Sequence, residues 1–296
     1  MRDEIGKIQD LMEDAQYVTD AAIATSVHLA MRLRKPLLIE GHAGVGKTEV
    51  AKVMARMLDT NLIRLQCYEG LDASTALYEW NYQKQLLHIK LHEDSARSVD
   101  EKEHEIFSEA FLLRRPLLQA ITQEFQAPVL LVDEVDRSDE EFEAFMLEVF
   151  SDWQVTIPEI GTIKATHPPH VILTSNRTRE LSDALRRRCL YLWIDYPTFD
   201  KEVRIVERKV PGINTRLARE VARFMASLRQ VRLSKVPGVS ETLDWAQALV
   251  SMHADHLEEA VIAQTLGCVL KDADDLKRFR AEVAKAGLTP FLQVPG

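Results

Sequence analysis

A glycine-rich stretch that ends in lysine and threonine carries the sharpest chemical signal in the chain. Residues 41–48 read GHAGVGKT and fill the pattern G-x-x-x-x-G-K-[ST], with an additional glycine at the fourth position. Glycines let consecutive backbone N–H groups turn inward around phosphates, the lysine reaches the β- and γ-phosphates, and the threonine hydroxyl is a Mg²⁺ ligand. The pattern predicts a loop that binds ATP with Mg²⁺, made by Gly41, His42, Ala43, Gly44, Val45, Gly46, Lys47, Thr48 and Glu49.

Two carboxylates and an amide follow apolar runs further along the chain. Asp133 and Glu134 come directly after Leu130-Leu131-Val132, and Asn176 follows the apolar run that begins at Val171. In a parallel sheet such strand ends lie at the edge where ligands bind. We expect Asp133 to hold Mg²⁺ through water and Glu134 to act as the general base for hydrolysis. Asn176 is expected to orient the attacking water or to contact the γ-phosphate.

Three consecutive arginines, at positions 186–188, stand between a short polar segment and an apolar run. A basic run is often a solvated face or a nucleic-acid contact. At this position it suggests an arginine finger, a guanidinium presented to the γ-phosphate held by a neighbouring subunit. Arg187 and Arg188 are the preferred catalytic candidates, because they lie closest to the strand that would fix their geometry.

Short apolar strands alternate with helical periodicity as far as residue 197, and only helical periods follow. This order is typical of a doubly wound α/β sheet followed by a smaller helical domain. We therefore expect an α/β nucleotide-binding core over 1–197 and an all-helical lid over 198–296. Strands are expected at 37–39, 62–67, 129–132, 171–174 and 190–194, a hairpin at 155–164, helices within 5–33, 107–125 and 142–150, and irregular or solvated segments at 68–91 and 95–105.

The charge, hydropathy and cysteine content of the chain disfavour several classes of protein. Lys+Arg 37 against Asp+Glu 46 gives a net charge of −9, which disfavours a broad nucleic-acid-binding surface. No apolar run approaches the ~20 residues of a membrane span, and the first residues lack the apolar centre of a secretory signal. The 3 cysteines form no C-x-x-C pair, so neither disulfides nor a cysteine zinc site are expected. These features favour a cytoplasmic protein without stable membrane insertion.

Taken together, the phosphate loop, LLVDE, the 155–164 hairpin, ILTSN and ALRRR resemble an AAA+ ATPase of the MoxR family over nearly the whole chain. The stretch LIRLQCYEGLDASTALYEWNYQKQLLHIKL is most similar to the CoxD-like branch, which is associated with carbon monoxide dehydrogenase maturation. The resemblance implies an AAA+ P-loop core with a helical lid, and a ring, commonly a hexamer, with ATP between subunits. It also implies a partner with a von Willebrand A domain and a chaperone role on a metalloenzyme client, such as a molybdenum-containing carbon monoxide dehydrogenase.

One segment departs from the family pattern. Many members carry an arginine in a G-A-S-P-R-A-like segment of the lid, which reaches the nucleotide. Here residues 238–243 read GVSETL, and no arginine occupies the expected place near Thr242. We therefore assign no residue of this lid as a nucleotide sensor on the basis of the resemblance.

Three other function classes remain open: an AAA+ module that acts on nucleic acid, a non-enzymatic metallochaperone and a small-molecule P-loop kinase. The histidine pairs 88/92, 167/170 and 253/256 have spacings that allow shared metal binding on a helix. No third ligand of suitable type is fixed nearby, so we expect no metal site made by protein groups alone. Glu134, the arginine triplet and the helical lid fit a kinase poorly.

Overall fold

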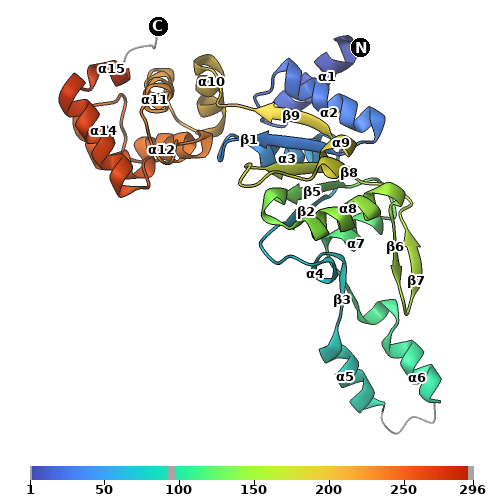
Figure 1. Cartoon of the computed structure of the whole chain (residues 1–296). Helices are drawn as coiled ribbons and strands as arrows, with labels where there is room; N and C mark the ends of the chain where they lie inside the picture. Colours follow the sequence, from blue (N-terminus) through green and yellow to red (C-terminus); the bar gives the residue numbers. More distant parts are fainter. Residues whose placement is uncertain (1, 93–97, 293–296) are drawn as a thin grey trace. The chain divides into compact units, whose positions relative to one another are not determined.

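A five-stranded sheet lies at the centre of the α/β part of the chain (Figure 1). The computed structural model describes residues 2–92 and 98–292, and in this part the strand order is β2-β5-β8-β1-β9. The pairs β2–β5, β5–β8 and β1–β8 are parallel. Both β1 and β5 are buried along their length, as expected of strands covered on both faces. The strands are β1 (Leu37–Gly41), β2 (Leu62–Gln66), β5 (Val129–Asp133), β8 (His170–Ser175) and β9 (Leu190–Ile194).

Helices interleave with these strands, which confirms the expected α/β fold class. Helix α8 shows why the sequence folds this way: Asp139 accepts a hydrogen bond from the Phe142 backbone at 2.8 Å and caps the helix. Phe142, Met146 and Val149 then recur at helical spacing, and all three are buried in the core. The helices of this part are α1 (Arg2–Asp14), α2 (Ala21–Leu33), α3 (Lys47–Met57), α8 (Glu140–Asp152) and α9 (Asp183–Arg188).

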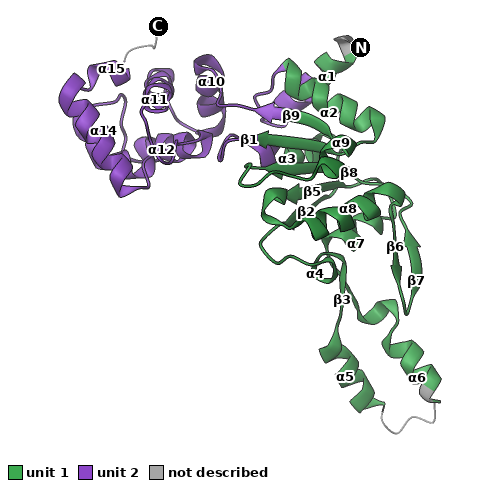
Figure 2. Cartoon of the chain, viewed as in Figure 1, with its two compact units in different colours: residues 1–8, 21–40, 50–192 green, residues 9–20, 41–49, 193–296 purple. Residues whose placement is uncertain are grey.

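The chain divides into two compact units (Figure 2). Unit 1 contains residues 1–8, 21–40 and 50–192, and unit 2 contains residues 9–20, 41–49 and 193–296. The residues of the phosphate loop thus group with the helices of the C-terminal part. The expected division after residue 197 stays a prediction.

The segment between β2 and β5 differs from the expectation. Residues 68–91, expected to be irregular, form α4 (Ala73–Leu77), β3 (Tyr78–Trp80) and α5 (Tyr82–Leu91). The two helices start at polar caps, since Asp72 accepts from the Thr75 backbone at 2.6 Å and Asn81 from the Lys84 backbone at 3.0 Å. Of the expected solvated stretch 95–105, residues 95–97 lie outside the described part, and most of the rest forms α6 (Val99–Ile106).

The single helix expected over 107–125 is wrong. This stretch forms the 3₁₀ turn η1 (Glu109–Phe111), strand β4 (Leu112–Arg114) and the short helix α7 (Pro116–Ile121). Pro116 lacks an N–H and therefore starts α7 rather than lying inside a longer helix. Strand β4 pairs antiparallel with β3, a long-range contact that local periodicity does not show.

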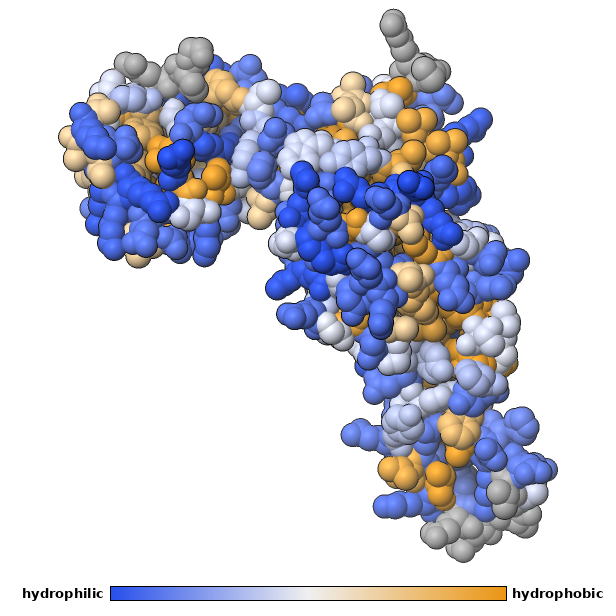
Figure 3. Space-filling model, in the orientation of Figure 1, coloured by the Kyte–Doolittle hydropathy of each residue, from blue (hydrophilic) through white to orange (hydrophobic). Residues whose placement is uncertain are grey.

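Helices α5 and α6 form an arm on unit 1 that carries apolar side chains at its surface (Figure 3). Tyr82, Leu86, Leu87 and Leu91 of α5 are between 58% and 71% exposed. On the same helix, the rings of His88 and His92 are 4.4 Å apart between centroids. The arm therefore contributes little to the core of unit 1.

A two-stranded hairpin precedes β8, as predicted. Strand β6 (Gln154–Ile157) pairs antiparallel with β7 (Gly161–Lys164). Val155 and Ile157 are buried, whereas Gln154 and Thr156 are exposed. This alternation is the pattern of a strand that is buried on one face only.

The C-terminal part has its own core, and its described residues, 198–292, contain helices and no strand, as predicted. Phe224, Trp245, Phe279 and Phe291 meet in its centre, and the Trp245 indole donates to Thr265 Oγ1 at 2.8 Å. None of the helices within residues 2–92 and 98–292 has the length and apolar character needed to cross a membrane. The helices are α10 (Phe199–Lys209), α11 (Thr215–Leu228), α12 (Val239–Ser251), α13 (Glu259–Thr265), α14 (Ala273–Ala286) and α15 (Thr289–Leu292), with the 3₁₀ turn η3 (Leu266–Cys268).

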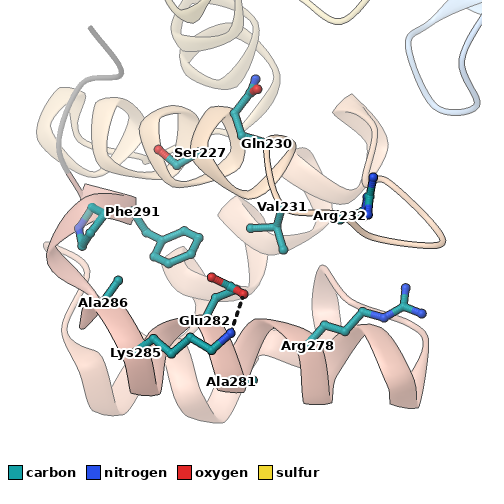
Figure 4. Close-up of a pocket in the computed structure, with 11 residues that line it drawn as sticks. Ser227, Gln230, Val231, Arg232, Arg278, Ala281, Glu282, Lys285, Ala286 and Phe291 are labelled. Carbon is teal, nitrogen blue, oxygen red and sulfur yellow. Dashed lines mark hydrogen bonds and ion pairs between the residues drawn. The ribbon is translucent and has the colours of Figure 1, made fainter.

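A cavity of about 820 Å³ opens beside α14 in the helical part (Figure 4). Val231 and Phe291 give it an apolar side, and Arg278 lies at its rim. The Lys285 ammonium donates to Glu282 Oε1 at 3.4 Å, and both side chains come from α14. None of the residues that the sequence assigns to chemistry lines this cavity.

A buried ion pair joins α10 to the end of α11. Arg229 Nη1 and Nη2 donate to the two carboxylate oxygens of Glu202 at 2.6 and 2.7 Å. The two side chains are only 6% and 0% exposed. Because neither charge is solvated, each depends on the other for compensation.

We expect Arg229→Met to lower the free energy of unfolding by about 3–5 kcal/mol, because Glu202 would remain buried without its cation. Urea denaturation measures this change, as a lower midpoint at an unchanged m value. Arg216→Met is the matched control: Arg216 pairs with Glu220 at 2.9 Å on the surface of α11, with 68% of its side chain exposed. This exposed pair is worth about 0.5 kcal/mol or less. Equal losses in the two variants would contradict the prediction.

Candidate functional site

The predicted phosphate loop connects β1 to α3, and its residues 41–49 lie in unit 2. Gly44 and Gly46 have φ angles of 74° and 95°, in the left-handed region that glycine adopts without steric cost. Lys47 is buried at the start of α3, and its Nζ donates to the carbonyl oxygens of Gly41 and His42 at 2.8 and 2.7 Å. The loop thus has the tight turns that the motif predicts, with the ammonium group beside its own backbone.

Two further contacts tie this loop to the helical part of unit 2. The carbonyl oxygen of Gly44 accepts hydrogen bonds from the backbone N–H groups of Val239 and Ser240, at 2.9 and 3.2 Å. Glu49, in the first turn of α3, accepts from Lys209 Nζ at 3.2 Å. Residues of the segment without the expected arginine therefore contact the loop through backbone atoms.

The acid pair lies at the end of β5 in unit 1. Asp133 is only 3% exposed, and its two oxygens accept from Thr174 Oγ1 and Arg64 Nη2, each at 2.5 Å. Glu134 follows with a φ of 55°, a left-handed conformation that is costly for a side chain with a Cβ. Its N–H donates to Thr174 Oγ1 at 2.9 Å. The Thr174 hydroxyl thus contacts both acids: it donates to the carboxylate of Asp133 and accepts from the backbone N–H of Glu134.

The structure brings Asn176 and Glu134 together. Asn176 Nδ2 lies 3.4 Å from Glu134 Oε1, and Gln66 Nε2 lies 3.2 Å from Glu134 Oε2. Arg137 Nη1 also donates to Oε2, at 3.2 Å. Arg64 in turn donates to Gln66 Oε1 at 2.5 Å, so one guanidinium contacts Asp133 directly and Glu134 through Gln66.

Four of these residues were missed by sequence reasoning: Arg64, Gln66, Arg137 and Thr174. A signal existed for Gln66, which is polar at the carboxyl end of β2, the strand beside β5. Thr174 lies one residue inside β8, where a threonine is an ordinary strand residue. Which strands are neighbours is not visible in the local pattern, and the partners of the two acids depend on that order.

A buried thiol lies beside the acid pair. Burial, together with the charges of Asp133 and Asp136, raises the pKa of Cys67 to about 12. The thiol therefore stays protonated at neutral pH and is a poor nucleophile. The chemistry of this edge of the sheet rests with the carboxylates and amides.

The arginine triplet ends α9, whose first turn is capped by Ser182 Oγ accepting from the Leu185 backbone at 3.3 Å. Arg188 Nη1 donates to the Leu147 carbonyl at 3.1 Å and to Ser151 Oγ at 3.0 Å, both on α8. Arg187 is exposed, and its side chain contacts no partner within residues 2–92 and 98–292. The structure therefore separates the two preferred candidates: Arg188 is bound to its own unit, and Arg187 is free to reach outward.

The histidine pairs belong to no larger cluster of potential metal ligands in the part of the chain that the structure describes. No three His, Cys, Asp or Glu side chains of that part are grouped so as to hold an ion. The His88 ring is tilted by 49° against that of His92, and His88 Nε2 lies 3.5 Å from Glu105 Oε1.

Comparisons with known proteins place this chain among the AAA domains. Residues 36–189, just over half of the chain, match the family model described as AAA domain (dynein-related subfamily). An uncharacterized protein of Staphylococcus aureus (strain bovine RF122 / ET3-1) is 24% identical over 241 residues, which cover 79% of this chain and 82% of that protein. The gas vesicle ATPase GvpN of Haloferax mediterranei is 24% identical over 293 residues, covering 92% of this chain and 80% of that protein.

Among solved structures, a proline-to-glycine mutant of Thermotoga maritima RuvB is 17% identical, with a TM-score of 0.51. The match covers 90% of this chain and 74% of that one. At this identity the likeness concerns the fold alone, and it agrees with an AAA core followed by C-terminal helices.

Proposed function

The chain belongs to the dynein-related subfamily of AAA domains, and from this premise we propose that it hydrolyses ATP to ADP and phosphate. The observation that carries the proposal is the environment of Glu134. Its carboxylate has amide donors on both oxygens, from Asn176 at 3.4 Å and from Gln66 at 3.2 Å. A carboxylate held in this way, beside a second acid at a strand end, suits a general base that takes a proton from water.

We propose Mg²⁺ as the ion that binds with ATP. A hard cation prefers carboxylate and hydroxyl oxygens, and the motifs assign it Asp133 at the end of β5 and Thr48 in the first turn of α3. Bound with ATP, the ion neutralises charge on the phosphates. Lys47 contributes a second positive charge, and Asn176 orients the water for Glu134.

The proposal predicts that Lys47→Ala abolishes measurable ATP binding, with a loss of at least about 100-fold, or about 2.7 kcal/mol. The reason is that the buried ammonium group would no longer be available to the β- and γ-phosphates. Isothermal titration with ATP and Mg²⁺ measures the affinity. Lys52→Ala, on the exposed side of the same helix, is the control and should bind ATP as the parent does. Unchanged affinity in Lys47→Ala would overturn the assignment of this loop.

We further propose that the protein is a MoxR-type chaperone of the CoxD-like branch, at work in the cytoplasm as a ring, a hexamer in keeping with the resemblance. Rings are common among AAA+ proteins, and the stretch at 62–91 supports the branch. The proposed partners are a protein with a von Willebrand A domain and a metalloenzyme client, such as a molybdenum-containing carbon monoxide dehydrogenase. The similarity to a gas vesicle ATPase supports the ATPase activity itself.

Co-purification tests the partners. Rings trapped with ATP in the native organism should retain the client and the von Willebrand A protein, whereas Lys47→Ala chains should not. Stimulation of ATP hydrolysis by DNA at low salt would instead favour a nucleic-acid-acting module. The net charge of −9 argues against that outcome.

A further inference from the structure

The segment at 238–243, which lacks the expected arginine, packs closely against the phosphate loop at Gly238. A Cβ on Gly238 would lie 2.6 Å from the Ala43 carbonyl oxygen and 2.9 Å from Gly44 Cα. A Cβ on Gly44 would lie 2.5 Å from Ser240 Oγ. Because the two backbones are this close, the start of α12 forms one wall of the loop.

A second contact reaches the loop from the segment just before the expected lid. The ring of Tyr196 stacks on that of His42, with centroids 4.6 Å apart and planes inclined by 8°. Trp193 meets the same histidine edge-on at 5.6 Å. The His42 carbonyl also accepts a hydrogen bond from Lys47 Nζ, so the stacked histidine itself contacts the lysine of the loop.

Arg229 connects these two contacts inside the lid. Its guanidinium carbon lies 4.9 Å from the Tyr196 ring centroid. Its Nε donates to the Pro237 carbonyl at 2.9 Å and its Nη2 to Thr242 Oγ1 at 3.2 Å, on either side of Gly238. Glu202 completes the cluster, since Thr242 Oγ1 donates to its carboxylate at 2.7 Å. One buried cation thus touches both segments that contact the loop.

We propose that Gly238, Tyr196 and Arg229 are positioning residues for ATP binding, which set the backbone of the phosphate loop from the lid side. They take over part of the role of the absent arginine without themselves touching the nucleotide. The physical reason is preorganisation: a loop held in its binding shape loses less conformational freedom when phosphates bind. This inference rests on the proposed ATP binding and goes beyond it by assigning lid residues to the loop.

The test compares dissociation constants for a fluorescent ATP analogue with Mg²⁺ in paired variants. Tyr196→Ala should weaken binding about three- to tenfold, as loss of an aromatic stack does. Tyr196→Phe should restore the parent affinity, because the ring is kept. Gly238→Ala should weaken binding at least about tenfold, since its Cβ would displace the loop backbone.

Two controls separate positioning from lid stability. Gly267→Ala adds a Cβ to a lid glycine that has nothing within 4 Å, and Arg219→Met removes a guanidinium 5.1 Å from the Phe199 ring, away from the loop. Both should bind the analogue as the parent does. In the positioning variants KM for ATP should rise while kcat at saturating ATP stays close to the parent value. Thermal unfolding of each variant shows whether the lid is still folded.

The outcomes distinguish this inference from the proposed function. If Lys47→Ala loses the analogue but Tyr196→Ala and Gly238→Ala bind it with the parent affinity, the positioning role is wrong and the ATP site stands. If the parent protein binds no ATP, the proposed function fails and the positioning role fails with it. Weakened binding in Tyr196→Phe equal to that in Tyr196→Ala would also overturn the stack as the cause.

Discussion

Replacing Arg187 with alanine is expected to slow ATP hydrolysis by about 10³–10⁵-fold while ATP binding is retained. The side chain is exposed at the end of α9 and has no partner in the described part of the chain, so its guanidinium is available to a neighbouring subunit. In the proposed ring, that group would face charge that develops on the γ-phosphate of the adjacent site. Steady-state turnover and ATP affinity of the variant, measured separately, check both parts of the expectation.

The same hypothesis predicts rescue when two inactive variants are mixed. Arg187→Ala chains keep the phosphate loop, and Lys47→Ala chains keep the arginine, so mixed rings regain some complete sites. Specific activity of the parent should also rise steeply with protein concentration as rings form. Arg186→Ala, an exposed neighbour on the same short helix, is the matched control. Full activity in a dilute monomer, without rescue on mixing, would mean that each chain completes its own site.

Glu134→Gln is expected to lower turnover by about 10²–10⁴-fold, the usual cost of losing a positioned general base. The amide keeps the size of the side chain but cannot take the proton from the attacking water. ATP should still bind and remain uncleaved, which a filter-binding assay with labelled ATP would detect. This separates the variant from Lys47→Ala, in which binding itself is lost.

A matched carboxylate makes this test specific. Glu141 lies in the first turn of α8, is exposed, and has no part in the contacts of the acid pair. Glu141→Gln should therefore hydrolyse ATP at the parent rate. Turnover of Glu134→Gln within a fewfold of the parent rate would assign the base to another residue.

The sequence predicted those parts of the fold and site whose cause is local. Uninterrupted apolar runs mark β5 and β8 because both faces of these strands are covered. The glycine spacing of the loop fixes its turns, and the Asp133–Glu134 pair and Asn176 follow directly from where their strands end. Contacts between Asn176 and Glu134 agree with the expectation that the two lie at one edge of the sheet.

What the sequence could not provide depends on contacts across long separations. Arg64 meets Asp133 only because β2 pairs with β5, and no local pattern specifies that neighbour. The residues of strand β4 were predicted to be part of a helix. Their strand conformation depends on pairing with β3, which lies more than thirty residues earlier. The contact of Gly238 with Gly44 also joins residues far apart in the sequence and was not predicted. A glycine at the start of a helix suggests a cap and does not indicate that two backbones lie close together.

The left-handed backbone of Glu134 has a consequence for laboratory evolution of this protein. A non-glycine residue at a φ of 55° costs roughly 1–2 kcal/mol, which asparagine or glycine at the same position would relieve in part. Selection for thermal tolerance alone would therefore enrich substitutions at the proposed base and yield hardier but inactive chains. A screen that rewards turnover and heat resistance together would keep Glu134 and find its stabilising changes elsewhere.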